Sequence, residues 1–239
     1  MTVVSFYSSS SSNYWVQRQR PPTEQEQTSI PWLPLLSKAE RDFVLPEIKV
    51  TLADEGDVIC RIGKPVTYWF GVIEGLLKMS SDSAEGKTMT FVGVPSGGWF
   101  GEGTALKREP YRYNISALRK SVVAGISIEA FHWLGDHSIA FNKYLMRQLN
   151  ERLSQFIAAR EVDRISNPEQ RVARTLASLL NPTLYPKIGN SLSITQQELA
   201  YLVGLSRQRV NVALKALEAQ GTIHLVYGGL VVPDIQKLI

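Results

Sequence analysis

The chain has 239 residues, of which 44% are hydrophobic and 20% are charged, and its formal net charge is +4. This composition is that of a globular protein of one or two domains, without the run of ~20 apolar residues that a membrane helix needs or the apolar core of a secretory signal. The single cysteine, Cys60, excludes an internal disulfide and a cluster held by several thiolates, and it fits the reducing cytoplasm, where we expect the protein to act.

The first 30 residues are the least globular stretch of the sequence. A run of serines at positions 8–12 is followed by several glutamines and prolines. Such a segment buries too little apolar area to offset its ordering entropy, so residues 1–30 are predicted to form a disordered arm. A short helix is expected after it, at residues 38–45.

Residues 48–134 alternate between short apolar runs and glycine turns. The runs include residues 58–60, 68–73, 89–92 and 121–126, and the turns include Gly56, Gly63, Gly75, Gly86 and Gly97-Gly98. Short β-rich segments at this turn spacing are typical of an antiparallel barrel or sandwich. We assign residues 31–136 to this β domain.

A helical pattern replaces the strands from residue 137 on. No Pro or Gly occurs up to residue 163, and apolar side chains recur every three or four positions, at Phe141, Leu145, Leu149, Leu153 and Phe156. This spacing predicts an amphipathic helix of roughly seven turns. Its apolar stripe favours a dimeric coiled coil, and the alternative is that the stripe packs on the β domain of its own chain. Both can be partly true, and we assign residues 137–166 to a dimerisation helix.

The remaining residues, 167–239, form a small basic unit. From residue 164 to the end there are eight Lys and Arg against four Asp and Glu, so the net charge of the chain is concentrated there. Asn167-Pro168 breaks the long helix, and Pro168 suits the first turn of a new helix at 169–180. A basic unit on a neutral body favours a polyanionic partner, although charge alone fits an ordinary basic surface equally well.

Residues 194–217 carry the strongest functional pattern. Thr195 and Glu198 form a capping box at the start of one helix. Gly204 permits a sharp turn, and Ser206 can cap a second helix. Two short helices joined at a glycine, with polar groups at the start of the second, are typical of a DNA-reading helix-turn-helix; the alternative is a helical hairpin with a solvated face.

The candidate DNA contacts lie at the start of the first helix and on the outer face of the second. They are Thr195, Gln196, Ser206, Arg207, Gln208, Arg209, Asn211, Val212 and Lys215. Arginine suits guanine, and glutamine or asparagine suits adenine. Residues 223–226 and 230–232 flank Tyr227-Gly228-Gly229, which predicts a hairpin that rests as a wing on the phosphate backbone.

Two segments resemble the superfamily of the cyclic-AMP receptor protein and the fumarate-nitrate regulator, Crp/Fnr, and the resemblance covers residues 35–239. The first is Phe100-Gly101-Glu102-Gly103 with Arg112, which resembles the phosphate-binding cassette of the cyclic-nucleotide barrel. The second lies within residues 199–210 and resembles the reading unit of the superfamily. The resemblance implies an α+β fold with a cyclic-nucleotide-binding-type β-roll, a long dimerisation helix and a C-terminal winged helix-turn-helix.

The same resemblance places a candidate effector pocket in the β-roll. Its residues are Gly101, Glu102, Arg112, Tyr113 and Phe156. In the cyclic-AMP-binding members, a Ser and an Ala follow the cassette Arg, whereas this chain has Tyr113 and Asn114 there. In the same members, a Thr and a Ser of the long helix face the adenine, and this chain has Phe156 and Ile157 at those positions. Because these polar partners are missing, we expect an effector other than cyclic AMP, or none. The alternative role for Glu102 and Arg112 is a salt bridge within the barrel.

The reading unit also departs from many relatives. Gln208, Arg209 and Val212 stand where those relatives have Glu, Thr and Arg. Glutamine both donates and accepts hydrogen bonds, whereas a carboxylate only accepts them. Val212 has no group that could donate a hydrogen bond to guanine. The operator is therefore expected to differ from the one that cyclic-AMP-binding relatives prefer.

These patterns predict a sequence-specific transcriptional regulator that binds an inverted-repeat operator as a homodimer. Its implied partners are double-stranded DNA, a second copy of the chain and RNA polymerase. We expect no cofactor and no metal or haem site, since His132 and His137 would not share a helix face. No enzymatic activity is expected, because no histidine lies near a nucleophile motif. The alternative is a ligand-binding module that regulates a protein partner and uses its helix-turn-helix only structurally.

Overall fold

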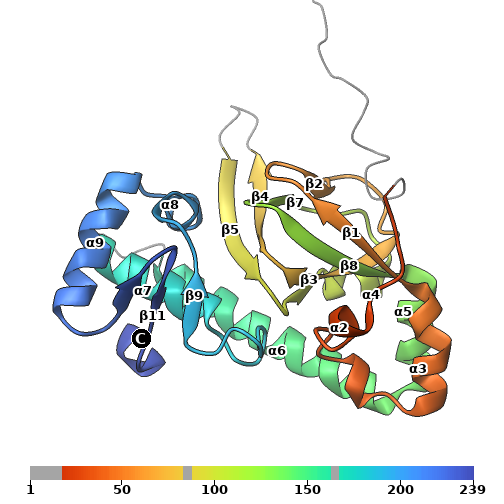
Figure 1. Ribbon diagram of the computed structural model, residues 1–239. Coiled ribbons are helices and arrows are strands. Elements are labelled where there is room, and N and C mark those ends of the chain that lie inside the picture. Colours follow the sequence, from red (N-terminus) through yellow and green to blue (C-terminus); the bar gives the residue numbers. More distant parts are fainter. Residues whose placement is uncertain (1–17, 83–87, 163–166) are drawn as a thin grey trace, which may run out of the picture.

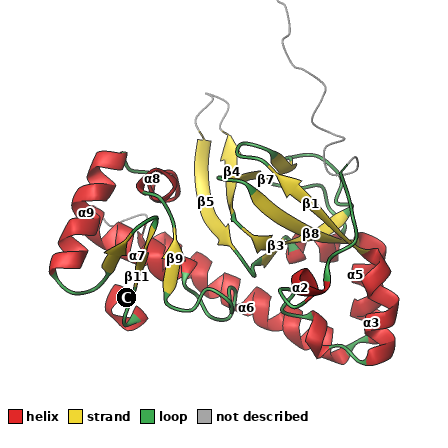
Figure 2. Cartoon of the chain, in the orientation of Figure 1, coloured by secondary structure: helices red, strands yellow, loops and turns green. Residues whose placement is uncertain are grey.

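The computed structural model describes residues 18–82, 88–162 and 167–239. A long helix joins a β-roll to a smaller C-terminal unit of helices and a short sheet (Figure 1). Figure 2 shows most strands gathered in the β-roll, with helices packed at one end of it and around the C-terminal sheet. The α+β architecture expected from the sequence is confirmed.

The β-roll consists, in its described part, of two antiparallel four-stranded sheets. One has the order β1 (Ile48–Ala53), β8 (Ser121–Ser127), β3 (Tyr68–Glu74) and β6 (Trp99–Phe100), and the other has the order β2 (Val58–Cys60), β7 (Asn114–Ala117), β4 (Leu76–Asp82) and β5 (Thr88–Pro95). Each of the four apolar runs that predicted a strand lies within one of these strands. Alternating residues face the interior because successive side chains of a strand point to opposite sides of the sheet.

Aromatic rings form the centre of the β-roll core. The ring centroids of Trp69 and Trp99 lie 4.5 Å apart, and Trp32 packs edge-on against Trp99 at 5.1 Å. Phe141 of the long helix contacts Trp32 and Trp69, both at 5.6 Å. These four rings are at most 1% exposed. Tilted and edge-on pairs at such distances are favourable, so strands, N-terminal segment and long helix share one core.

Short helices close the β-roll. They are η1 (Leu33–Leu35), α3 (Lys38–Val44), η2 (Leu45–Glu47), α4 (Glu102–Lys107) and α5 (Ile128–His137). The helix predicted at residues 38–45 is confirmed, and its start is explained by a capping box between Ser37 and Glu40.

The predicted disordered arm is wrong for residues 18–30, while residues 1–17 lie outside the described part of the chain. Arg20 exchanges two backbone hydrogen bonds with Val50 of β1, at 2.8 and 3.0 Å. Helix α2 (Glu24–Gln27) follows, and Ile30 is fully buried. This polar segment is ordered because an existing strand edge satisfies its backbone and the core takes up Ile30, contributions that composition does not reveal.

The long helix is α6 (Ile139–Val162), and it starts after a break at Ser138 instead of continuing from residue 137. The Ser138 hydroxyl accepts from the Phe141 amide at 3.2 Å. Phe141 and Leu145 are buried against the β-roll, whereas Leu153 and Phe156 are about 60% exposed. The alternative that the stripe packs on the β-roll of its own chain is confirmed for the first half of the helix, while the second half of the stripe is exposed in the single chain. No described helix is both long and apolar enough to cross a membrane.

The C-terminal unit contains three α-helices and a three-stranded sheet among its described residues. They are α7 (Pro168–Leu179), β9 (Ser191–Ser193), α8 (Gln196–Val203), α9 (Arg207–Ala219), β10 (His224–Val226), β11 (Gly229–Val231) and the final turn η3 (Ile235–Leu238). The predicted hairpin is confirmed as β10 and β11. Strand β9, which pairs with β11, was not anticipated, because three residues are too few to produce an alternating pattern.

Candidate nucleic-acid interface and effector site

The first helix of the helix-turn-helix, α8, begins and ends at the predicted signals. The Glu198 carboxylate accepts from the Thr195 amide at 2.7 Å, and the Thr195 hydroxyl accepts from the Glu198 amide at 3.1 Å. Gly204 ends the helix at φ 70°, a conformation that a side chain would disfavour. The chain therefore turns sharply into α9.

The second helix, α9, separates an inward apolar stripe from an outward polar face. The Ser206 hydroxyl accepts from the Arg209 amide at 3.3 Å and caps the helix. The inward side chains are Val210, Ala213, Leu214 and Leu217, all at most 5% exposed. The outward, exposed side chains are Arg207, Gln208, Arg209, Val212 and Lys215. Such a helix presents hydrogen-bonding groups to solvent without disturbing its packing.

The residues predicted to contact DNA from α8 lie beside those from α9. The Gln196 amide donates to the Asn211 side-chain oxygen at 3.0 Å and links the two helices. Thr195 is exposed next to this pair, and Ser206 is exposed at the start of α9. The structure thus brings the nine candidate side chains together on α8, α9 and the N-cap residues of the two helices.

The wing is tied to both neighbouring elements. The Leu225 amide donates to the Glu218 carboxylate of α9 at 2.9 Å, and the Ser193 hydroxyl of β9 donates to the Gly228 carbonyl at 3.4 Å. Tyr227 is fully exposed at the tip. Anchored on two sides, the hairpin holds its tip in a defined place beside the helix-turn-helix.

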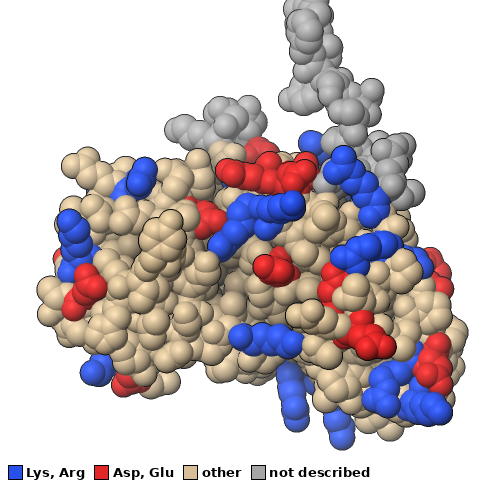
Figure 3. Space-filling model, in the orientation of Figure 1, with Lys and Arg blue, Asp and Glu red and all other residues tan. Residues whose placement is uncertain are grey.

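The basic groups of the C-terminal unit form no continuous patch on the face that is drawn in Figure 3. On the face shown in Figure 3, uncharged surface separates the Lys and Arg groups of this unit. Arg171 has a structural role, since its guanidinium donates to the Val203 carbonyl at 2.8 Å. A sparse distribution of cations favours recognition through a few placed contacts over a broad electrostatic surface.

The glutamate of the cassette that resembles a phosphate-binding loop is paired with an arginine of the long helix. Gly101 adopts φ 85° at the start of α4, and the following Glu102 is only 1% exposed. The Arg152 guanidinium of α6 lies 2.5 Å from the Glu102 carboxylate and also donates to the Trp99 carbonyl. Burial alone would lower the pKa of Arg152, but the Glu102 carboxylate raises it. The guanidinium is therefore held charged inside the protein.

The proposed alternative of a Glu102–Arg112 salt bridge is wrong. Arg112 is exposed and pairs with Glu109 at 2.9 Å, and Lys107 together with Arg112 lowers the pKa of Glu109. The reason is geometric: Arg112 follows a loop that turns its side chain to solvent, while Arg152 reaches Glu102 from the adjacent helix. A charged residue on the inward side of α6 was the sequence signal for this partner.

The remaining candidate pocket residues are only partly brought together. Tyr113 is half-buried beside the cassette, and a Cβ at Gly101 would lie 3.1 Å from its hydroxyl. Burial raises the pKa of Tyr113 to about 12, so it stays protonated. Phe156 and Ile157 are 58% and 61% exposed on α6 and do not close over the cassette in the single chain.

Known proteins resemble this chain over most of its length. Residues 52–138 match the family model of the cyclic nucleotide-binding domain, and residues 170–239 match that of the Crp-like helix-turn-helix domain. The cAMP-activated global transcriptional regulator CRP of Haemophilus influenzae is 30% identical over 178 residues, which are 70% of this chain and 78% of that protein. The chain belongs to the Crp/Fnr superfamily of transcriptional regulators.

Two further comparisons agree with this assignment. The cAMP-activated global transcriptional regulator Vfr of Pseudomonas aeruginosa is 32% identical over 165 residues, 65% of this chain and 76% of that protein. FixK2 of Bradyrhizobium japonicum has the same fold, with a TM-score of 0.60 at 14% identity over 80% of this chain and 95% of that one. The resemblance stated from the sequence is confirmed, and the chain is a DNA-binding regulator.

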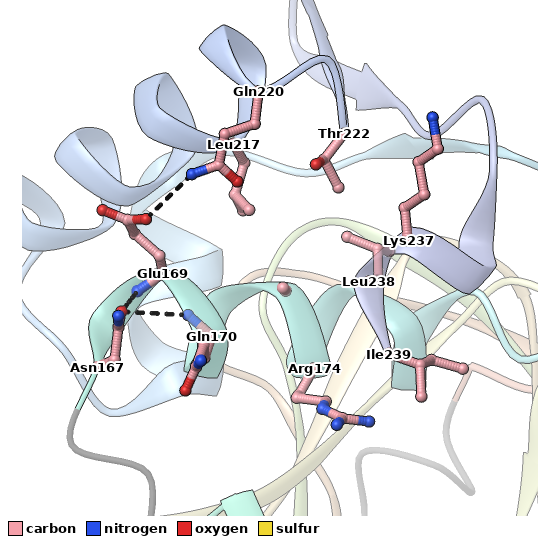
Figure 4. A pocket seen from close by; sticks show the side chains of 11 residues that line it. Asn167, Glu169, Gln170, Arg174, Leu217, Gln220, Thr222, Lys237, Leu238 and Ile239 are labelled. Carbon is pink, nitrogen blue, oxygen red and sulfur yellow. Dashed lines mark hydrogen bonds between the residues drawn. The ribbon is translucent and has the colours of Figure 1, made fainter.

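A pocket of about 360 Å³ in the DNA-binding unit of this Crp/Fnr protein was not anticipated. Figure 4 shows it between the start of α7, the end of α9 and the last turn of the chain. Gln220, which follows the last residue of α9, donates to Glu169 of α7 at 3.4 Å along one edge of the pocket. Its walls come from segments about 50 residues apart in sequence, so no local pattern could predict it.

Proposed function

We propose that this Crp/Fnr regulator is a homodimer that reads an inverted-repeat operator, with one α9 helix in each of two successive major grooves. The observation that carries the proposal is the outer face of α9, where Arg207 and Gln208 are exposed in its first turn. A guanidinium can donate two hydrogen bonds to guanine, and a glutamine amide can pair with adenine. Arg209, in the same turn, is assigned to a phosphate.

The exposed half of α6 supports the dimer. Ile139, Met146 and Leu153 are spaced by seven residues and are between 60% and 74% exposed in the single chain. Leu149 and Phe156 are also seven residues apart. They follow Met146 and Leu153 by three residues and so form a second heptad position beside the first. A heptad of apolar residues at two positions is what a left-handed coiled coil buries, so a second α6 is the partner this stripe fits.

The effector of this dimer is proposed to differ from cyclic AMP, or to be absent. Glu102 is already paired with Arg152, Arg112 faces solvent, and Tyr113 stands beside the cassette glycine. Two relatives are named cAMP-activated, so cyclic AMP remains the ligand to test first. In this proposal the protein works in the cytoplasm with RNA polymerase as a further partner, and it has no catalytic role.

Binding-site selection tests the function directly. Purified protein is incubated with random double-stranded DNA, with and without small molecules extracted from cells, and bound fragments are sequenced. The expected product is an inverted repeat whose half-site centres lie about one helical turn apart, ~34 Å. Ultracentrifugation of the complex should give two chains per site. A single half-site bound by one chain would overturn the dimer, and no enrichment would favour the protein-partner alternative.

A further inference from the structure

A β-roll arginine reaches into the DNA-binding unit. Arg119 lies between β7 and β8, and its guanidinium is 3.1 Å from the Glu198 carboxylate of α8. It also donates to the Ser193 carbonyl of β9 at 2.6 Å. The side chains of Arg119 and Glu198 are 30% and 9% exposed. An ion pair with this little solvent is stronger than a surface pair, and the added hydrogen bond fixes its direction.

Glu198 connects Arg119 to the N-terminal end of α8, the end that should approach DNA. One of its carboxylate oxygens accepts from the Thr195 amide in the capping box, while the other faces Arg119. The first turn of α8, with Thr195 and Gln196, is thereby linked through one carboxylate to the β-roll.

Ser193 connects Arg119 to the wing. Its carbonyl accepts from Arg119, and its hydroxyl donates to the Gly228 carbonyl near the wing tip. Ser193 is also the strand partner of Gly229. One guanidinium thus contacts the segment that leads into α8 and the strand that supports the wing.

Apolar side chains also join the β-roll to the DNA-binding unit. Leu76 and Leu118 of the β-roll are buried in the core of the DNA-binding unit. At Gly93 of β5, a Cβ would lie 2.8 Å from side-chain carbons of Leu179 and Leu202, which shows how closely α7 and α8 approach this strand. In this structure the helix-turn-helix is therefore docked on the β-roll by apolar contacts as well as by Arg119.

This orientation leaves the candidate reading surface open. Arg207, Gln208 and Arg209 are exposed while α8 is docked on β5, and so is Thr195. A contact that masked the DNA-binding face would bury these residues. The docked state is thus suited to binding DNA.

We propose that Arg119 is a positioning residue for operator recognition, which sets the distance between the two reading helices of the dimer and so selects the spacing of the half-sites. The inference rests on the proposed function. In a two-fold dimer, the orientation of each helix-turn-helix on its own β-roll determines where both α9 helices lie. Releasing Arg119 frees this orientation and broadens the range of spacings that the dimer accepts.

The test measures affinity against spacing. Fluorescence anisotropy titrations use the selected operator and versions with one or two base pairs added or removed between the half-sites. The parent should lose at least about tenfold in affinity on the altered spacings. Arg119→Ala should bind the selected spacing about tenfold more weakly and lose most of its discrimination among spacings.

Two further variants separate positioning from other effects. Lys120→Ala removes the same charge from the neighbouring, exposed residue and should keep the parent profile. Glu198→Gln can still form the capping box but lacks the charge, so it should reproduce Arg119→Ala, and the double variant should be no worse than either alone. Thermal unfolding followed by circular dichroism checks that all variants are folded.

The outcomes are distinct. A uniform loss of affinity at every spacing would overturn the inference, because it indicates only lost charge or stability. Tighter binding by Arg119→Ala would also overturn it and would identify the contact as inhibitory. If the parent binds no DNA, the proposed function fails and this inference with it, whereas a parent that binds and a variant with an unchanged spacing profile contradict this inference alone.

Discussion

Individual side chains on α9 are expected to make unequal contributions to DNA binding. Arg207→Ala and Gln208→Ala should each cost ~1–3 kcal/mol and relax the preference at one position of each half-site. Arg209→Ala should lower the affinity for all DNA sequences to a similar degree, since a phosphate contact carries no base preference. Competition titrations with single-base operator variants measure this. Equal discrimination by Arg207→Ala and the parent would contradict the assignment.

Arg152 illustrates how a buried charge depends on its partner. Arg152→Ala leaves the Glu102 carboxylate buried without its cation, and we expect a loss of about 3–5 kcal/mol in the free energy of unfolding. The matched control is Arg112→Ala. The Arg112 guanidinium is exposed beside Glu109, so this substitution should leave the stability close to that of the parent.

Urea unfolding of the parent and of both variants measures the loss in the free energy of unfolding for each variant. Adding Glu102→Gln to Arg152→Ala should recover part of the loss, because an uncharged amide is less costly to bury than a carboxylate. A loss no larger than that of the Arg112 control would show that the buried pair does not stabilise the fold.

At the scale of elements, α6 packs on the β-roll with one part and is proposed to pair with a second α6 through another. Its first turns pack on the β-roll through Phe141 and Leu145, and its later turns expose the heptad stripe. Leu153→Asp places a charge in that stripe and should convert the dimer into monomers at micromolar concentration, because a buried unpaired carboxylate opposes association.

Sedimentation velocity measures the oligomeric state of this variant. Ser154→Asp introduces the same charge at the next residue, which lies on another side of the helix and is exposed, so it should remain dimeric. Dissociation of both variants alike would point to helix destabilisation, and a dimeric Leu153→Asp would place the interface elsewhere.

At the scale of the whole molecule, the candidate effector site and the DNA-binding unit belong to one connected structure. We expect cyclic AMP to bind weakly and to change operator affinity little. The Arg112 guanidinium faces solvent, and Phe156 and Ile157 offer the base no hydrogen bonds. Two or three buried polar groups left unpaired amount to ~3–6 kcal/mol, or about two to four decades of affinity.

Calorimetry with cyclic AMP and cyclic GMP checks this prediction. Micromolar binding of either nucleotide, together with a change in operator affinity, would show that Arg112 and Tyr113 rearrange to form a pocket. An aromatic or apolar effector would suit the phenyl ring of Phe156 and the sec-butyl group of Ile157 better than a nucleotide does.

The amino-acid sequence by itself determined the features that depend on neighbours three or four residues apart. The capping box of α8, the glycine turn between α8 and α9 and the apolar stripe of α9 were all predicted, because their contacts are local and recur with the helical period. The cassette and reading unit also identified the superfamily. These features fix which helices form and which faces are polar.

Only the tertiary structure decided which distant residues meet. Glu102 pairs with Arg152 rather than with Arg112, Arg119 reaches Glu198 across the domain junction, and residues 18–30 are ordered on the edge of β1. Each of these contacts joins segments about 30 to 80 residues apart, and for the two ion pairs many residues of the same charge compete. The choice among them is made by packing and burial of the assembled elements, which no local pattern encodes.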